Sequence, residues 1–459
     1  MRNEPDRWVS DRSMALLTDL YELTMLQAYW AGEMFEEAVF SLFVRELPEE
    51  RSFLLAAGLD DALHYLEHLT FEEDALSFLA GRPELQPGFV DWLADFRFTG
   101  EVRAVPEGTP VFGNEPILEV AAPLPEAQLV ETFVMNQVHL QTTLASKGAR
   151  VVAAAGGRDV VDFGLRRIHG ADAGLKAARA FHIAGVAGTS NVLAGRAYGI
   201  PLSGTMAHSY IQAHDDELEA FRDFARTFPE TVLLVDTYDT AEGVRRVVRL
   251  AEDLGEDFRV RGVRLDSGDL GALAREARSI LDGAGLHGVR IIASGGLDEW
   301  KVAELVAQGA PIDAFGVGTR MGVSSDAPTL DMAYKLVEYA GRGRIKLSTG
   351  KVSLPGRKQV FRVEERGEAV RDVIARADEE LPGRPLLRTV MQGGRRTEAG
   401  RAEMDEARAE AARALGGLPS RLRRLEPADP PYAVEVSEAL RRDLDELSGQ
   451  AQRGAGWMG

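Results

Sequence analysis

The side chains best suited to chemistry in this sequence lie where short apolar runs end. His208 follows IPLSGTMA, Asp236 is the last residue of TVLLVD, and Asp266 is the last residue of RVRGVRLD. Functional side chains of α/β proteins gather at the carboxyl ends of the parallel strands. An imidazole nitrogen can act as a nucleophile, and carboxylates bind Mg²⁺ or ribose hydroxyls. The pattern therefore predicts one active-site edge that contains His208, Asp236 and Asp266.

Glycines and arginines occupy equivalent positions on the neighbouring runs. Ser-Gly-Gly (294–296) follows VRIIAS, and Gly-Val-Gly-Thr (316–319) ends IDAFGV and extends past it. Glycine lets backbone N–H groups approach phosphate oxygens, and the following helix adds a favourable dipole. A guanidinium is a planar fork for carboxylate or phosphate. We therefore expect phosphate at the glycine turns and an anionic group near three arginines, Arg166, Arg167 and Arg264.

The elements that must position these residues alternate between strand-like and helical segments from Arg158 onward. The helical segments carry apolar residues at a period near 3.6, for example Val244, Val247 and Ala251. Repeated βα units favour an irregular α/β barrel, and an open doubly wound sheet is the rival fold. The seven strand-like runs are 158–164, 185–190, 200–207, 231–236, 259–266, 289–294 and 312–317.

The two flanks of this region have a different pattern. Residues 1–150 mix helical segments with β-type pieces, and we interpret them as an N-terminal α+β domain. The barrel would then occupy residues 151–335. The C-terminal region, residues 336–459, is β-leaning to about residue 390 and includes GRIKLSTGKVSLPGRKQVFRVE. Beyond that point the charged runs predict solvated helices.

Bulk composition excludes several classes of function. The formal net charge is -19, which argues against nucleic acid or an anionic membrane surface as a partner. The chain has no cysteine, and it shows neither a signal-peptide pattern nor a membrane-spanning run. We expect a cytoplasmic protein. There is no GxxxxGK[ST] motif, so any use of ATP proceeds without a P-loop.

Several longer motifs resemble the nicotinate phosphoribosyltransferase family. They are LLTDLYELTM (16–25), DFGLRRIHGADAGLKAAR (162–179), GTSNVLAGRAYGIPLSGTMAHSY (188–210), VRLDSGDL (263–270), ASGGLDEW (293–300), GVGT (316–319), YKLVEY (334–339) and KLSTGKVSLPGRKQVFR (346–362). The resemblance runs from about residue 11 to residue 362 with the motifs in family order, and no motif matches after about residue 395.

The resemblance implies a type II phosphoribosyltransferase of NAD salvage. Such an enzyme joins nicotinate to 5-phosphoribosyl 1-diphosphate, releases diphosphate and couples this glycosyl transfer to ATP hydrolysis, with Mg²⁺ as cofactor. It implies that His208 is transiently phosphorylated by ATP. It also implies a homodimer in which Tyr21 reaches into the partner's site.

The resemblance further implies a division of labour among the site residues. Nicotinate would contact Tyr21, Thr205 and Arg264, with Arg166 nearby. Asp236 and Asp266 would contact ribose or Mg²⁺. Arg264 suits the carboxylate of nicotinate, which nicotinamide lacks, and Tyr21 can stack on the pyridine ring. The 5-phosphate would be held by Gly295, Gly296, Gly316, Gly318 and Thr319.

Two kinds of alternative stay open at this point. One is a phosphoribosyltransferase of the same fold class that uses nicotinamide or quinolinate. The other is a sensor that binds phosphoribosyl ligands without catalysis, although such a sensor has no need of a phosphorylatable His208. An i,i+4 pair, His64 and His68, could be read as metal ligands, but an exposed pair beside Glu67 is better interpreted as inert.

Overall fold

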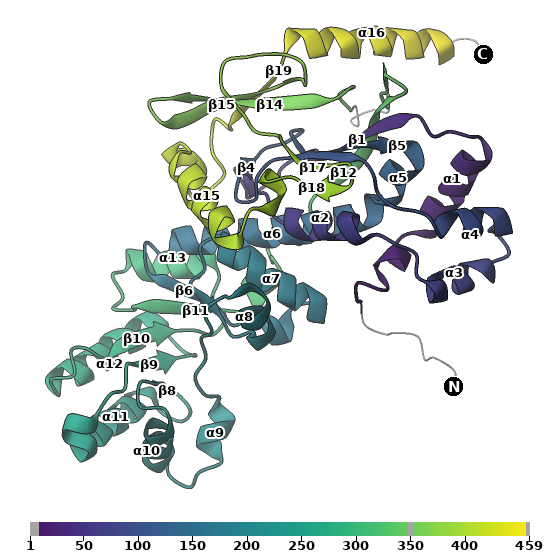
Figure 1. Cartoon of the computed structure of the whole chain (residues 1–459). Helices are drawn as coiled ribbons and strands as arrows, with labels where there is room; N and C mark the ends of the chain where they lie inside the picture. Colours follow the sequence, from purple (N-terminus) through teal and green to yellow (C-terminus); the bar gives the residue numbers. More distant parts are fainter. Residues whose placement is uncertain (1–8, 348–352, 456–459) are drawn as a thin grey trace. The chain divides into compact units, whose positions relative to one another are not determined.

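The computed structural model describes residues 9–347 and 353–455, and the chain divides into two compact units (Figure 1). One unit contains the residues up to 146 together with those from 329 on, and the other contains residues 147–328. The first and last parts of the sequence thus build a single unit. The division into an N-terminal domain, a barrel domain and a C-terminal region stays a prediction. The central part of GRIKLSTGKVSLPGRKQVFRVE, residues 348–352, lies outside the described residues.

The discontinuous unit is organised around an antiparallel sheet of seven strands in the order β13-β12-β1-β5-β3-β17-β18. β1 (Glu37–Val44) lies near its centre, between β12 and β5, and seven of its eight residues are buried. The other strands are β3 (Glu101–Ala104), β5 (Pro116–Pro123), β12 (Met332–Tyr339), β13 (Arg342–Gly343), β17 (Arg388–Gln392) and β18 (Arg395–Arg396).

Helices and two smaller sheets complete this unit. The helices are α1 (Leu20–Ala31), α2 (Leu59–His68), α3 (Glu73–Ala80), α4 (Pro87–Leu93), α5 (Leu124–Leu129), the first part of α6 (Glu131–Ala154), α15 (Met404–Gly416) and α16 (Glu438–Ala455). The last two confirm that the charged tail is helical. The small sheets contain β16 (Arg384–Pro385), β14 (Lys358–Glu365), β15 (Glu368–Arg376) and β19 (Ala433–Val436), and β2 (Leu54–Leu55) with β4 (Pro110–Val111).

The continuous unit is the predicted α/β fold, with a curled parallel sheet that forms a half-barrel. Its strand order is β7-β6-β11-β10-β9-β8, so the first strand of the series, β6, pairs with the last, β11. A cyclic order of this kind is that of a barrel, and it excludes the doubly wound alternative. The strands are β6 (Asp159–Asp162), β7 (Gly188–Thr189), β8 (Val232–Leu234), β9 (Gly262–Leu265), β10 (Arg290–Ala293) and β11 (Ala314–Val317).

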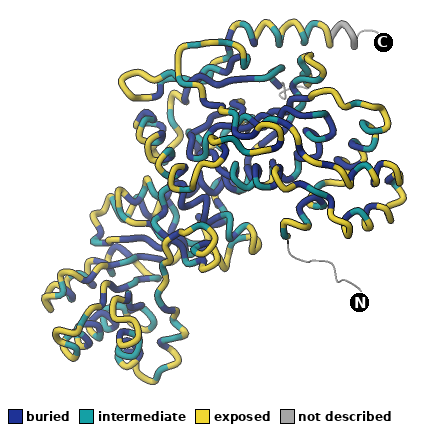
Figure 2. Tube along the Cα trace, viewed as in Figure 1, coloured by how far each residue is buried: buried dark blue, intermediate teal, exposed yellow. Residues whose placement is uncertain are grey.

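One of the seven expected strand runs is not a strand. Residues 200–207 contribute only an isolated bridge between Leu202 and Thr189, and the sheet is open between β7 and β8 at this place. Pro201 has no N–H to donate to a ladder, and Gly204 weakens an extended segment. The prediction of a strand at residues 200–207 was therefore wrong, and the barrel is irregular because this strand is missing. Figure 2 shows the six strands that do form as largely buried segments.

Helices follow the strands as the apolar periodicity predicts. Asp239, Asp269 and Asp298 cap α11, α12 and α13 by accepting a backbone N–H at the helix start. Asp269 is thus a helix cap. The helices are α7 (Ala171–Ile183), α8 (Val192–Tyr198), α9 (His208–Gln212), α10 (Glu217–Thr227), α11 (Thr240–Leu254), α12 (Leu270–Gly283), α13 (Glu299–Ala307) and α14 (Thr319–Gly322).

A buried carboxyl group on α1 predicts a pH dependence of stability. Glu22 has no exposed surface, its Oε2 accepts a hydrogen bond from Gln128 at 2.8 Å, and its Oε1 has no partner among the described residues. Burial, together with the nearby Glu131 and Asp19, raises the pKa of Glu22 to about 7, although hydrogen bonds from Gln128 and Tyr21 oppose the shift. The folded chain therefore holds this proton over a pH range in which the unfolded chain loses it.

We expect Glu22→Gln to stabilise the protein at alkaline pH. Stability that depends on the protonated carboxyl is lost as pH rises from about 4.5 to about 7, whereas glutamine stays neutral throughout. The difference in melting temperature, variant minus wild type, should therefore grow between about pH 5 and about pH 8. A difference that stays constant across this range would contradict the assignment.

Candidate active site

A cavity of about 730 Å³ lies at the carboxyl ends of the strands in the half-barrel unit. Each strand except β8 has a residue of its own end or of the following loop in the lining, as the positions of polar residues in the sequence predicted. The lining residues are Phe163, Arg166, Arg167, Ser190, Gly204, Thr205, Met206, Ala207, His208, Arg264, Asp266, Ser294, Gly295, Gly296, Leu297, Gly316, Gly318, Thr319 and Arg320.

His208 is the first residue of α9, and its side chain is 41% exposed. Its Nδ1 lies 3.1 Å from the hydroxyl of Thr237, and its Nε2 lies 3.9 Å from Asp266 Oδ2. Thr237 follows β8, so the loops after β8 and β9 both face the imidazole. A ring hydrogen-bonded at Nδ1, with Nε2 at a longer distance from a carboxylate and open to a cavity, is suited to accept a transferred group.

The two predicted carboxylates are linked to each other. Asp236 Oδ2 accepts hydrogen bonds from the Asp266 N–H and the Ser267 hydroxyl, each at 2.8 Å. Asp236 itself does not line the cavity, and its Oδ1 is buried without a hydrogen-bond partner among the described residues. Asp236 thus holds the loop that presents Asp266 and keeps one oxygen unused.

Mg²⁺ fits this pair only as an ion shared with a substrate. Among the described residues, no group of three or more His, Cys, Asp or Glu side chains could hold a metal. Mg²⁺ commonly takes one or two carboxylates and completes its shell with substrate phosphates and water. Asp266 and the unused oxygen of Asp236 match that requirement.

Arg264 lies on β9 and is already hydrogen-bonded inside the site. Its Nη2 donates to the Met206 carbonyl at 2.7 Å, and its Nη1 donates to Asp266 at 3.1 Å and to Ser294 at 3.3 Å. Nε is buried with no partner among the described residues. Burial lowers the pKa of Arg264, opposed by Asp266 and Asp236, and a guanidinium stays protonated in proteins. Arg264 therefore supplies a fixed, desolvated positive charge.

The glycine turns pack tightly against neighbouring protein atoms. Gly295 has a φ of +87°, and a Cβ at this position would lie 1.7 Å from the Asp266 carbonyl oxygen. A Cβ on Gly316 would lie 2.5 Å from the Phe163 ring. Gly295 and Gly296 lead into α13, and Gly318 and Thr319 begin α14, so N–H groups at both turns are available to an anion.

We expect Gly295→Ala to damage both stability and activity. The added methyl group cannot avoid the Asp266 carbonyl, and the backbone conformation is itself unfavourable for alanine. The melting temperature should fall by a few degrees and activity by about a hundredfold. Gly283→Ala is the matched control, because nothing lies within 4 Å of its Cβ position at the end of α12. Equal behaviour of the two variants in thermal melts and assays would contradict this prediction.

Tyr21 belongs to the other unit. It lies in the first turn of α1 and is 47% exposed. Its contact with substrate therefore stays a prediction, as do the substrate contacts of Arg166 and Thr205, which do line the cavity.

Sequence reasoning missed several residues of the site. Phe163 and Ser190 line the cavity just after β6 and β7, and Leu297 and Arg320 line it before α13 and within α14. His208 was identified because it follows a predicted strand. The same criterion would have identified Phe163 and Ser190, which follow β6 and β7. The guanidinium of Arg264 lies 6.0 Å from the centroid of the Phe163 ring, so an aromatic face and a cation meet within one unit.

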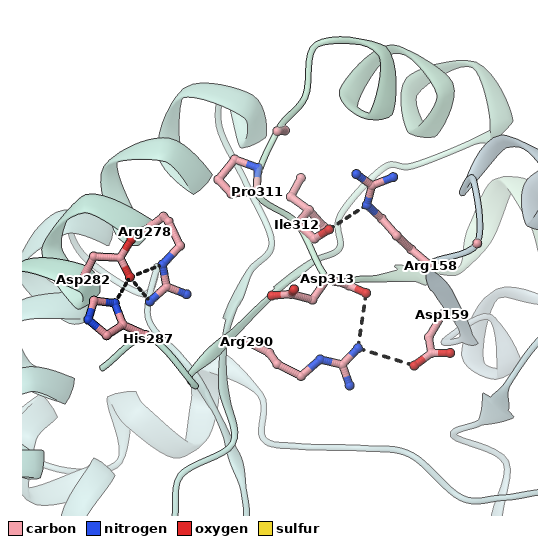
Figure 3. Close-up of a pocket in the computed structure, with 11 residues that line it drawn as sticks. Arg158, Asp159, Arg278, Asp282, His287, Arg290, Pro311, Ile312 and Asp313 are labelled. Carbon is pink, nitrogen blue, oxygen red and sulfur yellow. Dashed lines mark hydrogen bonds and ion pairs between the residues drawn. The ribbon is translucent and has the colours of Figure 1, made fainter. Parts of the chain in front are cut away.

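A second cavity, of about 690 Å³, lies at the opposite, amino-terminal ends of the strands (Figure 3). Its charged groups bind one another or backbone carbonyls. Arg158 donates to the Ile312 carbonyl at 2.9 Å, Arg290 donates to the Asp313 carbonyl at 3.2 Å, and Asp282 lies 2.9 Å from His287. These bonds leave no convergent set of donors aimed into the cavity, so we interpret it as structural.

Comparisons with known proteins agree with the site. The N-terminal domain model of nicotinate phosphoribosyltransferase matches residues 16–139, and the family model matches residues 159–347. A nicotinate phosphoribosyltransferase of Mycobacterium tuberculosis is 55% identical over 94% of both chains. One from Bacillus subtilis is 42% identical over 82% of this chain and 79% of its own. The crystal structure of human nicotinic acid phosphoribosyltransferase is 31% identical, with a TM-score of 0.84 over 94% of this chain and 99% of that one.

The half-barrel, with glycine turns of the kind that can bind phosphate, is typical of an α/β-barrel transferase site. The chain belongs to the nicotinate phosphoribosyltransferase family. No helix within the described residues is long and apolar enough to cross a membrane.

Proposed function

We propose that this protein forms nicotinate mononucleotide and diphosphate from nicotinate and 5-phosphoribosyl 1-diphosphate. The observation that carries the proposal is one cavity that combines a buried guanidinium, two glycine turns for phosphate and an accessible imidazole. Family membership identifies the ring substrate, and the positive charge of Arg264 favours the acid over the amide.

At the ring end of the site, Arg264 attracts the carboxylate of nicotinate and Phe163 offers an aromatic face beside it. A charge-assisted hydrogen bond of this kind contributes roughly 1.5–3 kcal/mol. With the carboxylate fixed, the ring nitrogen is free to point toward the ribose. That nitrogen attacks C1 of the sugar, and the bond from C1 to the diphosphate oxygen breaks.

At the phosphate end, the turns at Gly295–Gly296 and Gly318–Thr319 hold the 5-phosphate through backbone N–H groups. The carboxylate of Asp266 faces the positive charge that develops on the ribose, and Asp236 fixes its loop. Asp236 and Asp266 would hold Mg²⁺, which neutralises charge on the departing diphosphate when bound.

ATP enters through His208. A neutral imidazole nitrogen attacks the γ-phosphorus, ADP leaves, and the phosphohistidine is later hydrolysed to inorganic phosphate. The new negative charge directly follows the Gly204–Ala207 segment, which has few backbone hydrogen bonds of its own and is held by Arg264 through the Met206 carbonyl. Phosphorylation can therefore order this segment and couple ATP hydrolysis to transfer.

We also propose a homodimer in which the partner supplies Tyr21 to stack on the pyridine ring. Large apolar side chains are exposed around Tyr21 on one unit, namely Leu17 and Leu20. The half-barrel unit exposes Val192, Leu193 and Leu202 beside the active-site loops. Contiguous exposed apolar residues of this kind are typical of subunit contacts. The substrates are cytoplasmic metabolites, so we expect the enzyme in the cytoplasm.

A comparison of three ring substrates tests the proposal. Purified protein is assayed with 5-phosphoribosyl 1-diphosphate, Mg²⁺ and ATP, and mononucleotide formation is measured with nicotinate, nicotinamide or quinolinate. We expect nicotinate to be strongly preferred and ATP to raise its rate. Faster turnover of either other ring would overturn the assignment, and tight binding of the diphosphate substrate without turnover would point to a sensor.

A further inference from the structure

Asp162 is a buried carboxylate that the reaction described above does not use. It is the last residue of β6, it is 1% exposed, and it is not among the residues that line the active-site cavity. Burial raises the pKa of this group, although hydrogen bonds from Gly164 and Thr189 oppose the shift. No cation is paired with Asp162 among the described residues, so two neutral donors provide its stabilisation.

One carboxylate oxygen of Asp162 binds the loop after β6, and the other binds the last residue of β7. Oδ1 accepts the backbone N–H of Gly164 at 2.8 Å, and Oδ2 accepts the hydroxyl of Thr189 at 2.7 Å. The backbone carbonyl of Asp162 accepts the N–H of Ser190 at 2.9 Å. Gly164 lies between Phe163 and the arginines of the β6 loop, and Ser190 lines the cavity from the β7 loop. One residue thus fixes two loops at the same wall of the cavity.

The network extends one step further through Thr189. The Thr189 N–H donates to the Pro201 carbonyl at 3.0 Å, and the Thr189 carbonyl accepts the Ser203 N–H at 2.9 Å. Residues 200–207 form no strand, so these bonds are the main backbone attachment of the segment that leads to His208. The sheet is open on this side, and the bonds of Asp162 and Thr189 take the place of a strand ladder.

We propose that Asp162 is a positioning residue for the ring-binding wall of the site, acting through Gly164 and Thr189. It sets where Phe163 and Ser190 stand relative to Arg264. The phosphate-facing turn after β10 rests on the Asp266 loop and not on this network, whereas the turn after β11 packs against it, since a Cβ on Gly318 would lie 3.1 Å from the Phe163 carbonyl oxygen. The inference rests on the proposed nicotinate transfer, because the ring substrate is what the wall would position.

The test compares Asp162→Ala with Asp162→Asn in steady-state kinetics. Alanine removes both acceptors, so KM for nicotinate should rise about tenfold or more, whereas KM for 5-phosphoribosyl 1-diphosphate changes less than about threefold. Asparagine keeps the volume and can still accept the Gly164 N–H, so it should recover most of the loss. Asp159→Asn is the matched control on the same strand, because Asp159 is exposed and meets Arg290 at the far cavity (Figure 3).

Thr189→Val gives an independent readout if Asp162→Ala fails to fold. Valine preserves the shape of threonine and removes the hydroxyl, so KM for nicotinate should rise. In the double variant with Asp162→Asn, the fold-increase in this KM should be smaller than the product of the increases in the two single variants. Wild-type protein that makes no nicotinate mononucleotide would sink the proposed function itself. The role of Asp162 alone would be overturned if the wild type is active but the variants keep its KM for nicotinate. The same holds if KM rises equally for nicotinate and for 5-phosphoribosyl 1-diphosphate.

Discussion

His208→Ala is expected to abolish the stimulation of transfer by ATP while slow, ATP-independent formation of nicotinate mononucleotide persists. In the proposed mechanism the imidazole accepts the phosphoryl group, and alanine offers no nucleophile in its place. The glycine turns, Arg264 and Asp266 remain, so substrate binding survives. Release of ADP in the presence of both substrates should fall to background, and the stimulated rate should fall by about a hundredfold or more.

The measurement is ADP release and mononucleotide formation in the same reaction. His287→Ala is the control, since this exposed histidine pairs with Asp282 at the far cavity (Figure 3). It should behave as wild type. ATP-driven stimulation that persists in His208→Ala would show that the phosphoryl group is carried elsewhere.

Arg264→Ala should weaken the use of nicotinate far more than the use of 5-phosphoribosyl 1-diphosphate. Loss of one charge-assisted contact corresponds to about tenfold to more than a hundredfold in KM for nicotinate. The structure adds a second consequence, because Asp266 and the Met206 carbonyl would each lose a donor. We therefore expect kcat to fall as well, and the preference for nicotinate over nicotinamide to shrink.

KM for both substrates and the nicotinate-to-nicotinamide ratio of kcat/KM provide the measurement. Arg261→Ala is a suitable control, because Arg261 is exposed and pairs with Glu230 on the surface. Effects of the same size on both substrates would mean that Arg264 holds phosphate.

The site could be predicted from sequence to the extent that it follows strand ends. Local apolar runs identified β6, β8, β9, β10 and β11, and the ends of these runs identified Asp266 and the glycine turns as neighbours. His208 was placed with them because it follows residues 200–207, and it does line the cavity. This rule works because parallel strands bring their carboxyl ends to one edge whatever their order. The apolar pattern also predicted a strand at residues 200–207, where Pro201 and Gly204 prevent one.

Features that depend on contacts between distant parts of the chain could not be predicted from local sequence patterns. β12 pairs with β1 across most of the chain, so the first and last parts of the sequence share one sheet, and no local pattern shows this. The hydrogen bond between Thr237 and His208 and the bonds that occupy Arg264 depend on exact loop geometry. Residue type identified a cation at position 264, but only the structure shows that Met206, Asp266 and Ser294 already bind it.

The most direct test of this account is the stoichiometry of a complete reaction with nicotinate, 5-phosphoribosyl 1-diphosphate, Mg²⁺ and ATP. Nicotinate mononucleotide, diphosphate and ADP are quantified in the same samples over time. We predict equal amounts of mononucleotide and diphosphate, accompanied by ADP whose formation requires His208. Mononucleotide formation without any release of ADP, or ADP release with no mononucleotide, would contradict the account.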